Sequence, residues 1–346
     1  MQKPRQEVYY KYARNGMEKR ERSVQEKLWD AVRRNSGLGV RRMIALGGDP
    51  MEPNKAGLNA VELAAWKNAP AAARELFAAG ALPENPAKKS RVLASYIAYM
   101  DEACLEIFIS AGANPAEAGE HGRSPLMDSA RSSKPGVIAR LLRDPRVALA
   151  SHLNLSNDSR DNMTALDYAV FYNNPAAVRE LLRAGAAIES IESPSGLHAG
   201  KPPRGKRSAL RRSALSIACI YEDDPNLPIA KMLISAGADL NFINTAGETP
   251  LEWATQSFGA EQARLTGQQD PHVQELLEKK IMLLLSSGAT LSTTGPGSLE
   301  KIERERGKAM AGLVKRIALS MAEEKALKEA CGGAGSGRDS KSAARL

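Results

Sequence analysis

Histidine and cysteine are the side chains of this 346-residue chain that would hold a zinc ion most specifically. The four histidines are scattered, and none has a second His or Cys at the spacing that a zinc site requires. Neither a G-x-S-x-G nucleophile motif nor a Walker phosphate-binding motif is present. The glycine cluster at 332–337 follows no predicted strand and opens no apolar helix, so it fits no known phosphate-binding loop. The sequence therefore predicts no catalytic residues, no metal, no cofactor and no enzyme activity.

Positive charge gathers in one short segment. Six cations lie within the twelve residues 201–212, with proline and glycine between them: Lys201, Arg204, Lys206, Arg207, Arg211 and Arg212. Such a cluster is typical of contact with a nucleic acid, an acidic partner or an import receptor, and equally of a solvated loop. No aromatic residue is interleaved to stack on bases, which makes nucleic-acid binding the weaker alternative.

The charge of the whole chain is unevenly distributed. Its net charge is +8, and residues 1–50, 186–215 and 298–346 are all basic, so the remainder is acidic. The apolar content of 43% and the charged content of 25% are those of an ordinary folded protein. The appendages rather than the body of the protein are therefore expected to attract polyanions.

The same sequence carries signals about compartment. No apolar run approaches the 18 residues of a membrane span, and the first 25 residues lack the apolar core of a secretory signal. The three cysteines, Cys104, Cys219 and Cys331, are odd in number and far apart, which is typical of reduced thiols. We expect a cytoplasmic monomer. The alternative is a bacterial effector exported into a host cell, or a toxin-neutralising partner, since the Ala- and Arg-rich composition and basic tail are compatible with either.

Glycine marks a repeat along most of the chain. A Gly-Gly or Gly-Ala pair follows an aliphatic V-x-x-L-L pattern six times, at 47–48, 80–81, 112–113, 185–186, 237–238 and 288–289. The first intervals are 33 and 32 residues, and later intervals are longer by insertions. Where the next glycine is due, Pro145 stands instead. The aliphatic spacing places these residues on one helical face, and glycine readily ends a helix.

A second column of residues precedes each of these helices. Five residues with good helix-capping side chains each stand before a short apolar segment: Asn59, Ser124, Thr164, Ser213 and Thr249. Asn68 and Asn173 follow in the turn between the two predicted helices, where asparagine tolerates left-handed backbone angles. The repeat unit is thus helix, turn, helix, glycine and polar loop, over about 33 residues.

Two segments resemble the T-P-L-H-x-A signature of ankyrin repeats. They are Gly-Arg-Ser-Pro-Leu-Met-Asp-Ser-Ala at 122–130 and Gly-Glu-Thr-Pro-Leu-Glu-Trp-Ala at 247–254, and Ser-Ala-Gly-Ala-Asp-Leu-Asn at 235–241 resembles the end of such a repeat. The resemblance implies an all-α ankyrin-repeat solenoid with loop insertions and a C-terminal helical cap. The His of the motif is absent at every repeat, where Glu62, Met127, Asp167, Ser216 and Glu252 stand, which implies different hydrogen bonding between repeats.

These patterns divide the chain into four parts. Residues 1–25 form a basic extension, and 26–291 form the repeat domain, with a half-repeat cap and about six repeats. The unit at 84–115 is degenerate and keeps only its second helix clearly, and insertions fall near 146–158, 190–212 and 257–271. An amphipathic helix at 298–330 either caps the stack or binds a partner. Residues 331–346, rich in glycine, form a disordered tail.

The resemblance also implies where a partner binds. In similar proteins the end of the first helix and the loop tips line a concave binding face. The side chains predicted to bind are Lys67, Arg123, Arg131, Arg160, Tyr172 and Tyr221. Trp66 and Phe171 lie beside them and fit either role, partner contact or packing against the next repeat. The predicted function is a non-catalytic protein-interaction scaffold, with polyanion binding through the basic appendages as the alternative.

Overall fold

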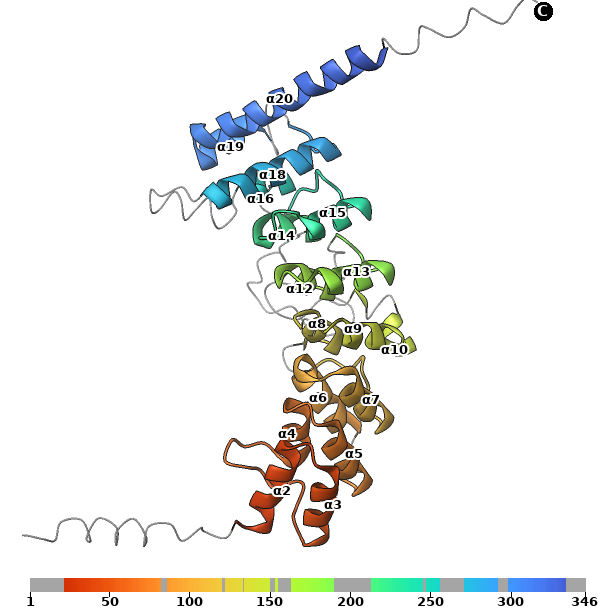
Figure 1. Cartoon of the computed structure of the whole chain (residues 1–346). Coiled ribbons are helices and arrows are strands. Elements are labelled where there is room, and N and C mark those ends of the chain that lie inside the picture. Colours follow the sequence, from red (N-terminus) through yellow and green to blue (C-terminus); the bar gives the residue numbers. More distant parts are fainter. Residues whose placement is uncertain are drawn as a thin grey trace, which may run out of the picture. The chain divides into compact units, whose positions relative to one another are not determined.

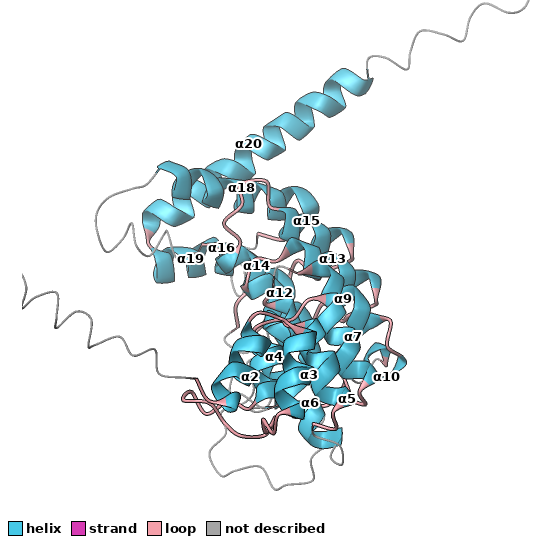
Figure 2. Ribbon diagram, turned by 60° about the horizontal axis from the view of Figure 1, so that its bottom comes forward, coloured by secondary structure: helices cyan, strands magenta, loops and turns pink. Residues whose placement is uncertain are grey.

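The computed structural model is predominantly helical, and no strand occurs among the residues that it describes (Figures 1 and 2). These residues are 22–81, 86–119, 122–132, 134–149, 153–154, 163–189, 213–244, 247–255, 271–291 and 298–333. Most of the predicted N-terminal extension, the whole insertion at 190–212, most of the other two insertions and the tail after 333 lie outside them. The chain divides into two compact units, Met1–Asn114 and Pro115–Leu346.

The N-terminal unit holds three successive helix pairs. They are α2 (Val24–Arg33) with α3 (Gly37–Ala45), α4 (Ala60–Trp66) with α5 (Pro70–Ala78), and α6 (Pro86–Tyr96) and η1 (Ile97–Tyr99) with α7 (Glu102–Ser110). Within this unit, α4 packs against α2 and α6, and α5 packs against α3 and α7. First helices therefore stack on first helices and second helices on second helices, as in a solenoid.

The C-terminal unit repeats this arrangement. Its pairs are α8 (Pro125–Ala130) with α9 (Pro135–Leu142), α12 (Ala165–Phe171) with α13 (Pro175–Arg183), α14 (Ala214–Tyr221) with α15 (Pro228–Ser235), α16 (Pro250–Ala254) with α18 (Pro271–Ser287), and α19 (Leu299–Arg306) with α20 (Lys308–Gly333). Helices α8, α12, α14 and α16 form one column in Figure 1, and α9, α13 and α15 form a second beside it. Between the first two pairs, α10 (Pro145–Ala148) packs against α9.

The predicted helix signals have the predicted geometry. All five capping side chains accept a hydrogen bond from the backbone N–H three residues later, at the start of α4, α8, α12, α14 and α16. All six glycines have positive φ, between 81° and 109°. At Gly185 the next N–H, of Ala186, donates to the carbonyl of Leu181 five residues earlier, which closes the helix end.

Asparagine in the turn links successive repeats of the N-terminal unit. Asn68 has a φ of 51°, as predicted. Its amide exchanges two hydrogen bonds of 2.8 Å with Asp101, the residue that caps α7 in the next repeat. One repeat earlier, Asn35 has a φ of 52° and accepts from the N–H of Ala72 at 3.1 Å. These bonds supply contacts between repeats in a chain whose motif lacks histidine.

Two predictions of elements were wrong. The unit at 84–115 has both helices, and its first helix was missed because its buried residues, Val92, Leu93, Ala94 and Ile97, lie late in α6 and η1. The N-terminal half-repeat is a complete pair, since Ser23 and Glu26 form a capping box at the start of α2. At the expected repeat stop, α9 ends at Leu142, and Pro145 opens the additional short helix α10 after an Asp144 cap.

The predicted single helix at 298–330 is also wrong. The chain breaks at Gly307, with a φ of 90°, and forms α19 and α20, which continues to Gly333. Ser298 caps α19, accepting from the N–H of Lys301 at 3.1 Å. Because α20 packs against both α19 and α18, the pair takes the place of one more repeat at the end of the stack. Its apolar residues Ile302, Ala311 and Val314 are buried, which supports the capping role.

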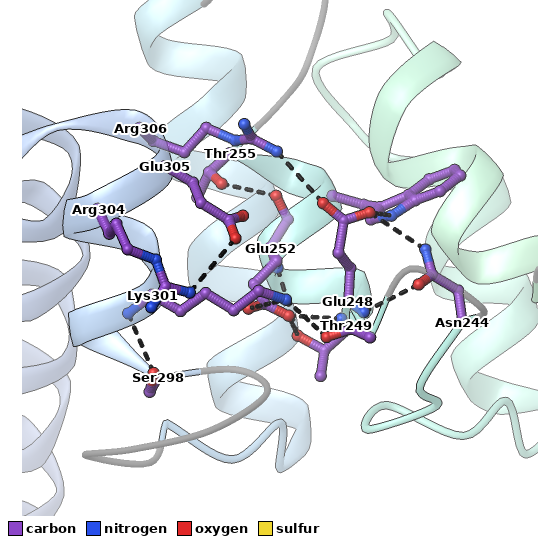
Figure 3. Close-up of polar contacts among 12 residues, drawn as sticks. Asn244, Glu248, Thr249, Glu252, Thr255, Ser298, Lys301, Arg304, Glu305 and Arg306 are labelled. Atoms are coloured by element: carbon purple, nitrogen blue, oxygen red, sulfur yellow. Dashed lines mark hydrogen bonds and ion pairs between the residues drawn. The ribbon is translucent and has the colours of Figure 1, made fainter.

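Charged side chains attach this terminal pair to the repeat before it (Figure 3). The ammonium of Lys301 donates to the carbonyl of Gly247 at 2.6 Å and lies 3.1 Å from the carboxylate of Glu252, which is almost fully buried. Arg306 lies 3.3 Å from Glu248, which also accepts from the indole of Trp253 at 2.7 Å. The junction is therefore polar and partly desolvated.

Candidate functional site

Three large aromatic side chains lie exposed at the ends of two neighbouring first helices. Phe171 and Tyr172 end α12 and Tyr221 ends α14, with 37%, 44% and 45% of their surfaces exposed. Both helices bury their earlier apolar residues, among them Leu166 and Leu215, in the stack. The fold therefore presents only the last turn of each helix to solvent, and we name Phe171, Tyr172 and Tyr221 the aromatic row.

The rings of the row touch one another across the boundary between repeats. The centroids of Phe171 and Tyr221 lie 4.5 Å apart, and those of Phe171 and Tyr172 lie 5.1 Å apart at an interplanar angle of 76°. Tyr168, one turn earlier on α12, stacks parallel to Tyr172 at 6.3 Å. Phe171 thus packs against the next repeat, which is one of the two roles predicted for it, and part of its ring is also exposed. These contacts hold the rings in fixed orientations.

A cation lies at one end of the row. The guanidinium of Arg131, at the end of α8, lies 5.0 Å from the centroid of the Tyr172 ring. Asp128, one turn earlier, lies 3.4 Å from Arg131 and 3.2 Å from Arg123. Burial raises the pKa of Asp128 in spite of both guanidinium groups, which act to lower it. Arg123, predicted to bind a partner directly, is thus an ion-pair partner of a buried carboxylate beside the row.

Acidic side chains lie at the other end. Tyr221 is followed by Glu222, Asp223 and Asp224, and Asp223 is exposed and accepts a hydrogen bond from the amide of Asn173. Glu222 is buried, and its carboxylate accepts from the N–H groups of Ile229 and Ala230 at 2.7 and 2.9 Å. Glu222 thereby caps α15, with its pKa raised by burial, and holds the chain after Tyr221 in place.

The other predicted contacts are not gathered at this site. Lys67 lies in the N-terminal unit, with its ammonium 4.0 Å from the centroid of the exposed Trp66 ring. Arg160 and the six cations between 201 and 212 lie outside the described residues. Four of the predicted contacts, Arg123, Arg131, Tyr172 and Tyr221, are therefore brought to one surface.

Three residues that were not predicted from the sequence complete this surface: Asp128, Tyr168 and Asp223. Asp128 lies at the variable position of the T-P-L-H-x-A motif and carried no signal of its own. Tyr168 could have been found, because it precedes Tyr172 by one helical turn. Asp223 could have been found from its place directly after the end of a predicted first helix.

The described residues provide no arrangement suited to metal binding or thiol chemistry. No three His, Cys, Asp or Glu side chains among them are grouped so that they could hold a metal ion. Cys104 and Cys219 are buried free thiols, and burial raises the pKa of Cys219 to about 12, so its reactive thiolate form is suppressed. In the same part of the chain, no helix combines the length and apolar character needed to cross a bilayer.

Comparisons with known proteins agree with this architecture. The family model for the ankyrin repeat matches residues 161–192, which include α12 and α13. The ankyrin repeat domain of human ASB11 matches with a TM-score of 0.50 and 18% identity, covering 75% of this chain and 98% of that domain. The ankyrin repeat domain of Bcl-3 matches with a TM-score of 0.42 and 20% identity, covering 78% and 89%. No curated protein sequence matches the chain. The predicted resemblance and the all-α repeat fold are confirmed.

Proposed function

We propose that this ankyrin-repeat chain is a scaffold that binds a protein partner through the aromatic row and Arg131, without converting a substrate. Ankyrin-repeat proteins are generally non-catalytic protein-interaction modules. The proposal makes the exposed ends of α8, α12 and α14 the binding surface of the C-terminal unit. Lys67 and Trp66 offer a second, similar pair in the N-terminal unit.

The observation that carries the proposal is the contact of three exposed rings with each other and with a guanidinium. Tyr, Trp and Arg dominate the binding energy of protein interfaces, because they bury much surface for few rotatable bonds. The ring contacts of 4.5 and 5.1 Å already order these side chains in the free protein. A partner therefore meets a preorganised surface and loses little side-chain entropy on binding it.

Alanine substitution of the row tests this proposal. We expect Tyr172→Ala with Tyr221→Ala to weaken capture of protein partners from a nuclease-treated native lysate by about tenfold or more, since each removes an exposed ring that the partner would bury on binding. Met282→Ala is the matched control, because Met282 is 48% exposed on the second helix α18. Equal capture by the double variant and the control would overturn the proposal.

A second candidate function rests on the basic segment at 201–212. Six cations in twelve residues support binding of a polyanion, with the repeats as a spacer. In that case affinity falls steeply with salt, because neutralised phosphates release their counterions. Arg160 and this segment would then contribute to binding and the aromatic row would not.

The working state that we propose is a cytoplasmic monomer. Its support is the odd number of scattered cysteines, two of which are buried free thiols. Export as an effector remains the alternative for localisation. Cell fractionation and sedimentation of the purified chain measure compartment and mass, and a sedimenting dimer or a recovered secreted form would contradict the proposed state.

A further inference from the structure

Opposite charges flank the aromatic row. At its α8 end, Arg123 and Arg131 pair with one carboxylate among the described residues, that of Asp128, so these three side chains together carry a net positive charge. The Arg131 side chain is 38% exposed and lies against the Tyr172 ring, whereas Asp128 is almost fully buried. Arg131 donates to Asp128 through Nη1, and its other N–H groups can donate to a carboxylate of a partner.

The α14 end is negative. Asp223 is exposed and Asp224 is half-buried, and neither forms an ion pair in the described part of the chain. The carboxylate of Glu222 does not face solvent, because it accepts hydrogen bonds from the N–H groups of Ile229 and Ala230 at the start of α15. Among the described residues, Lys280 interacts electrostatically with Glu222 and Asp223, but its ammonium is buried and donates to the carbonyl of Cys219 at 2.9 Å. This end therefore presents acidic groups to solvent.

The spacing of the helices fixes the separation of these ends. The cationic end lies on one repeat, Phe171 and Tyr172 on the next, and Tyr221 with Asp223 on the third. Packed helices lie about 8–10 Å apart, so the two ends are separated by roughly 20 Å. An extended peptide covers this distance with about six residues.

We infer that the aromatic row binds a protein segment with one acidic and one basic end, separated by a few apolar or aromatic residues. The acidic end lies on Arg131, the apolar residues lie on Phe171, Tyr172 and Tyr221, and the basic end lies on Asp223. The inference rests on the proposed function and adds the chemistry of the partner. Arg123 acts as a positioning residue, because it contacts Asp128 and Asp128 contacts Arg131.

Synthetic peptides on the full chain test the inference by fluorescence polarisation at low salt. All share a central Leu-Trp-Leu. Two bipolar peptides carry Glu-Glu-Gly on one side and Gly-Lys-Lys on the other, one in each order. Three controls carry glutamates on both sides, lysines on both sides or serines on both sides. We expect one of the bipolar peptides to bind at least about tenfold more tightly than each of the others, with a smaller advantage at high salt.

Charge reversal at each end sharpens the test. Arg131→Glu makes the surface acidic at both ends, and we expect its preferred peptide to become the lysine-flanked one. Asp223→Lys removes the excess of exposed negative charge at the α14 end, so we expect the bipolar peptide to lose its advantage over the glutamate-flanked one. Arg179→Glu is the matched control, since Arg179 is exposed on the second helix α13, and it keeps the bipolar preference.

Two results would overturn the inference. One is that no bipolar peptide binds at millimolar concentration, and the other is that all peptides bind equally and keep their order in the charge-reversed variants. Either result concerns only the charge pattern of the partner. Whether the aromatic row binds a protein at all is decided by the capture experiment with Tyr172→Ala and Tyr221→Ala. For a variant whose thermal unfolding midpoint falls, the peptides are ranked by affinity within that variant. A general loss of folded protein weakens the binding of all peptides alike and does not change this ranking.

Discussion

Asp128 connects the two arginines at the cationic end of the aromatic row. Its carboxylate is 7% exposed and lies within 3.4 Å of both guanidinium groups. Burial nevertheless dominates, and the pKa of Asp128 is raised. The ion pairs of Asp128 with Arg123 and Arg131 therefore form against a desolvation cost, and they place Arg131 beside Tyr172.

The raised pKa of Asp128 predicts how stability depends on pH. The folded state holds the Asp128 proton more tightly than the unfolded chain, where the pKa is about 3.9. Its contribution to stability is complete below that value and is lost as pH rises through the raised folded pKa. We expect wild type to lose stability relative to Asp128→Asn between pH 4 and pH 7, measured by urea unfolding. A wild type that gains stability relative to Asp128→Asn as the pH rises would contradict this.

At the scale of single elements, glycine and capping residues determine where helices end. Gly185 has a φ of 84°, and a Cβ added there would meet no atom within 4 Å. Any cost of a side chain at this position is therefore backbone strain alone. Gly312 lies inside α20, where a Cβ would come no closer than 3.9 Å to another side chain.

These two glycines predict opposite effects of the same substitution. We expect Gly185→Ala to lower the free energy of unfolding by about 1–2 kcal/mol, because alanine is strained at positive φ. Gly312→Ala is expected to raise it by up to about 1 kcal/mol, since alanine is the better helix former. Urea unfolding of both variants measures the pair, and a destabilised Gly312→Ala or an unaffected Gly185→Ala would contradict the argument.

The terminal helix pair depends on a partly buried ion pair. Lys301→Met removes the cation and leaves the carboxylate of Glu252, 3% exposed, without it. We expect a loss of about 1–3 kcal/mol, the usual cost of a buried polar group that loses its partner. Hydrogen exchange is expected to quicken in α19 and α20 while α12 and α13 keep their protection. If exchange quickened equally in both helix pairs, or in neither, the ion pair would not act locally on α19 and α20.

Local signals made most of these elements predictable, and the failures have physical causes. A capping side chain or a glycine acts within one turn, so Thr164 and Gly185 could be read from the sequence. The helix at 86–96 was missed because its buried residues lie only in its second half and in the following turn. The break at Gly307 was missed because no aliphatic stretch precedes this glycine, unlike the glycines of the repeats. At the site, Tyr172 and Tyr221 follow from the repeat register. The contacts of Arg131 with Asp128 and Tyr172 depend on packing between repeats, which spacing alone does not determine.

At the scale of the whole chain, the two candidate functions use different parts of the molecule. The aromatic row lies in the C-terminal unit on folded first helices, whereas the densest basic segment lies between α13 and α14 in the sequence. Binding through the row depends on rings that are fixed by neighbouring repeats. Binding through the basic segment depends on charge and therefore on salt.

A photo-crosslinking phenylalanine derivative at position 172 tests protein recognition by the aromatic row most directly. Irradiation of cells carrying this variant is expected to give a covalent adduct with a protein, resistant to nuclease, and so is the same derivative at position 221. The derivative at position 282, exposed on α18, is the control and is expected to give no such adduct. A protein adduct at 282 with none at 172 or 221, or adducts that nuclease digests, would contradict the account.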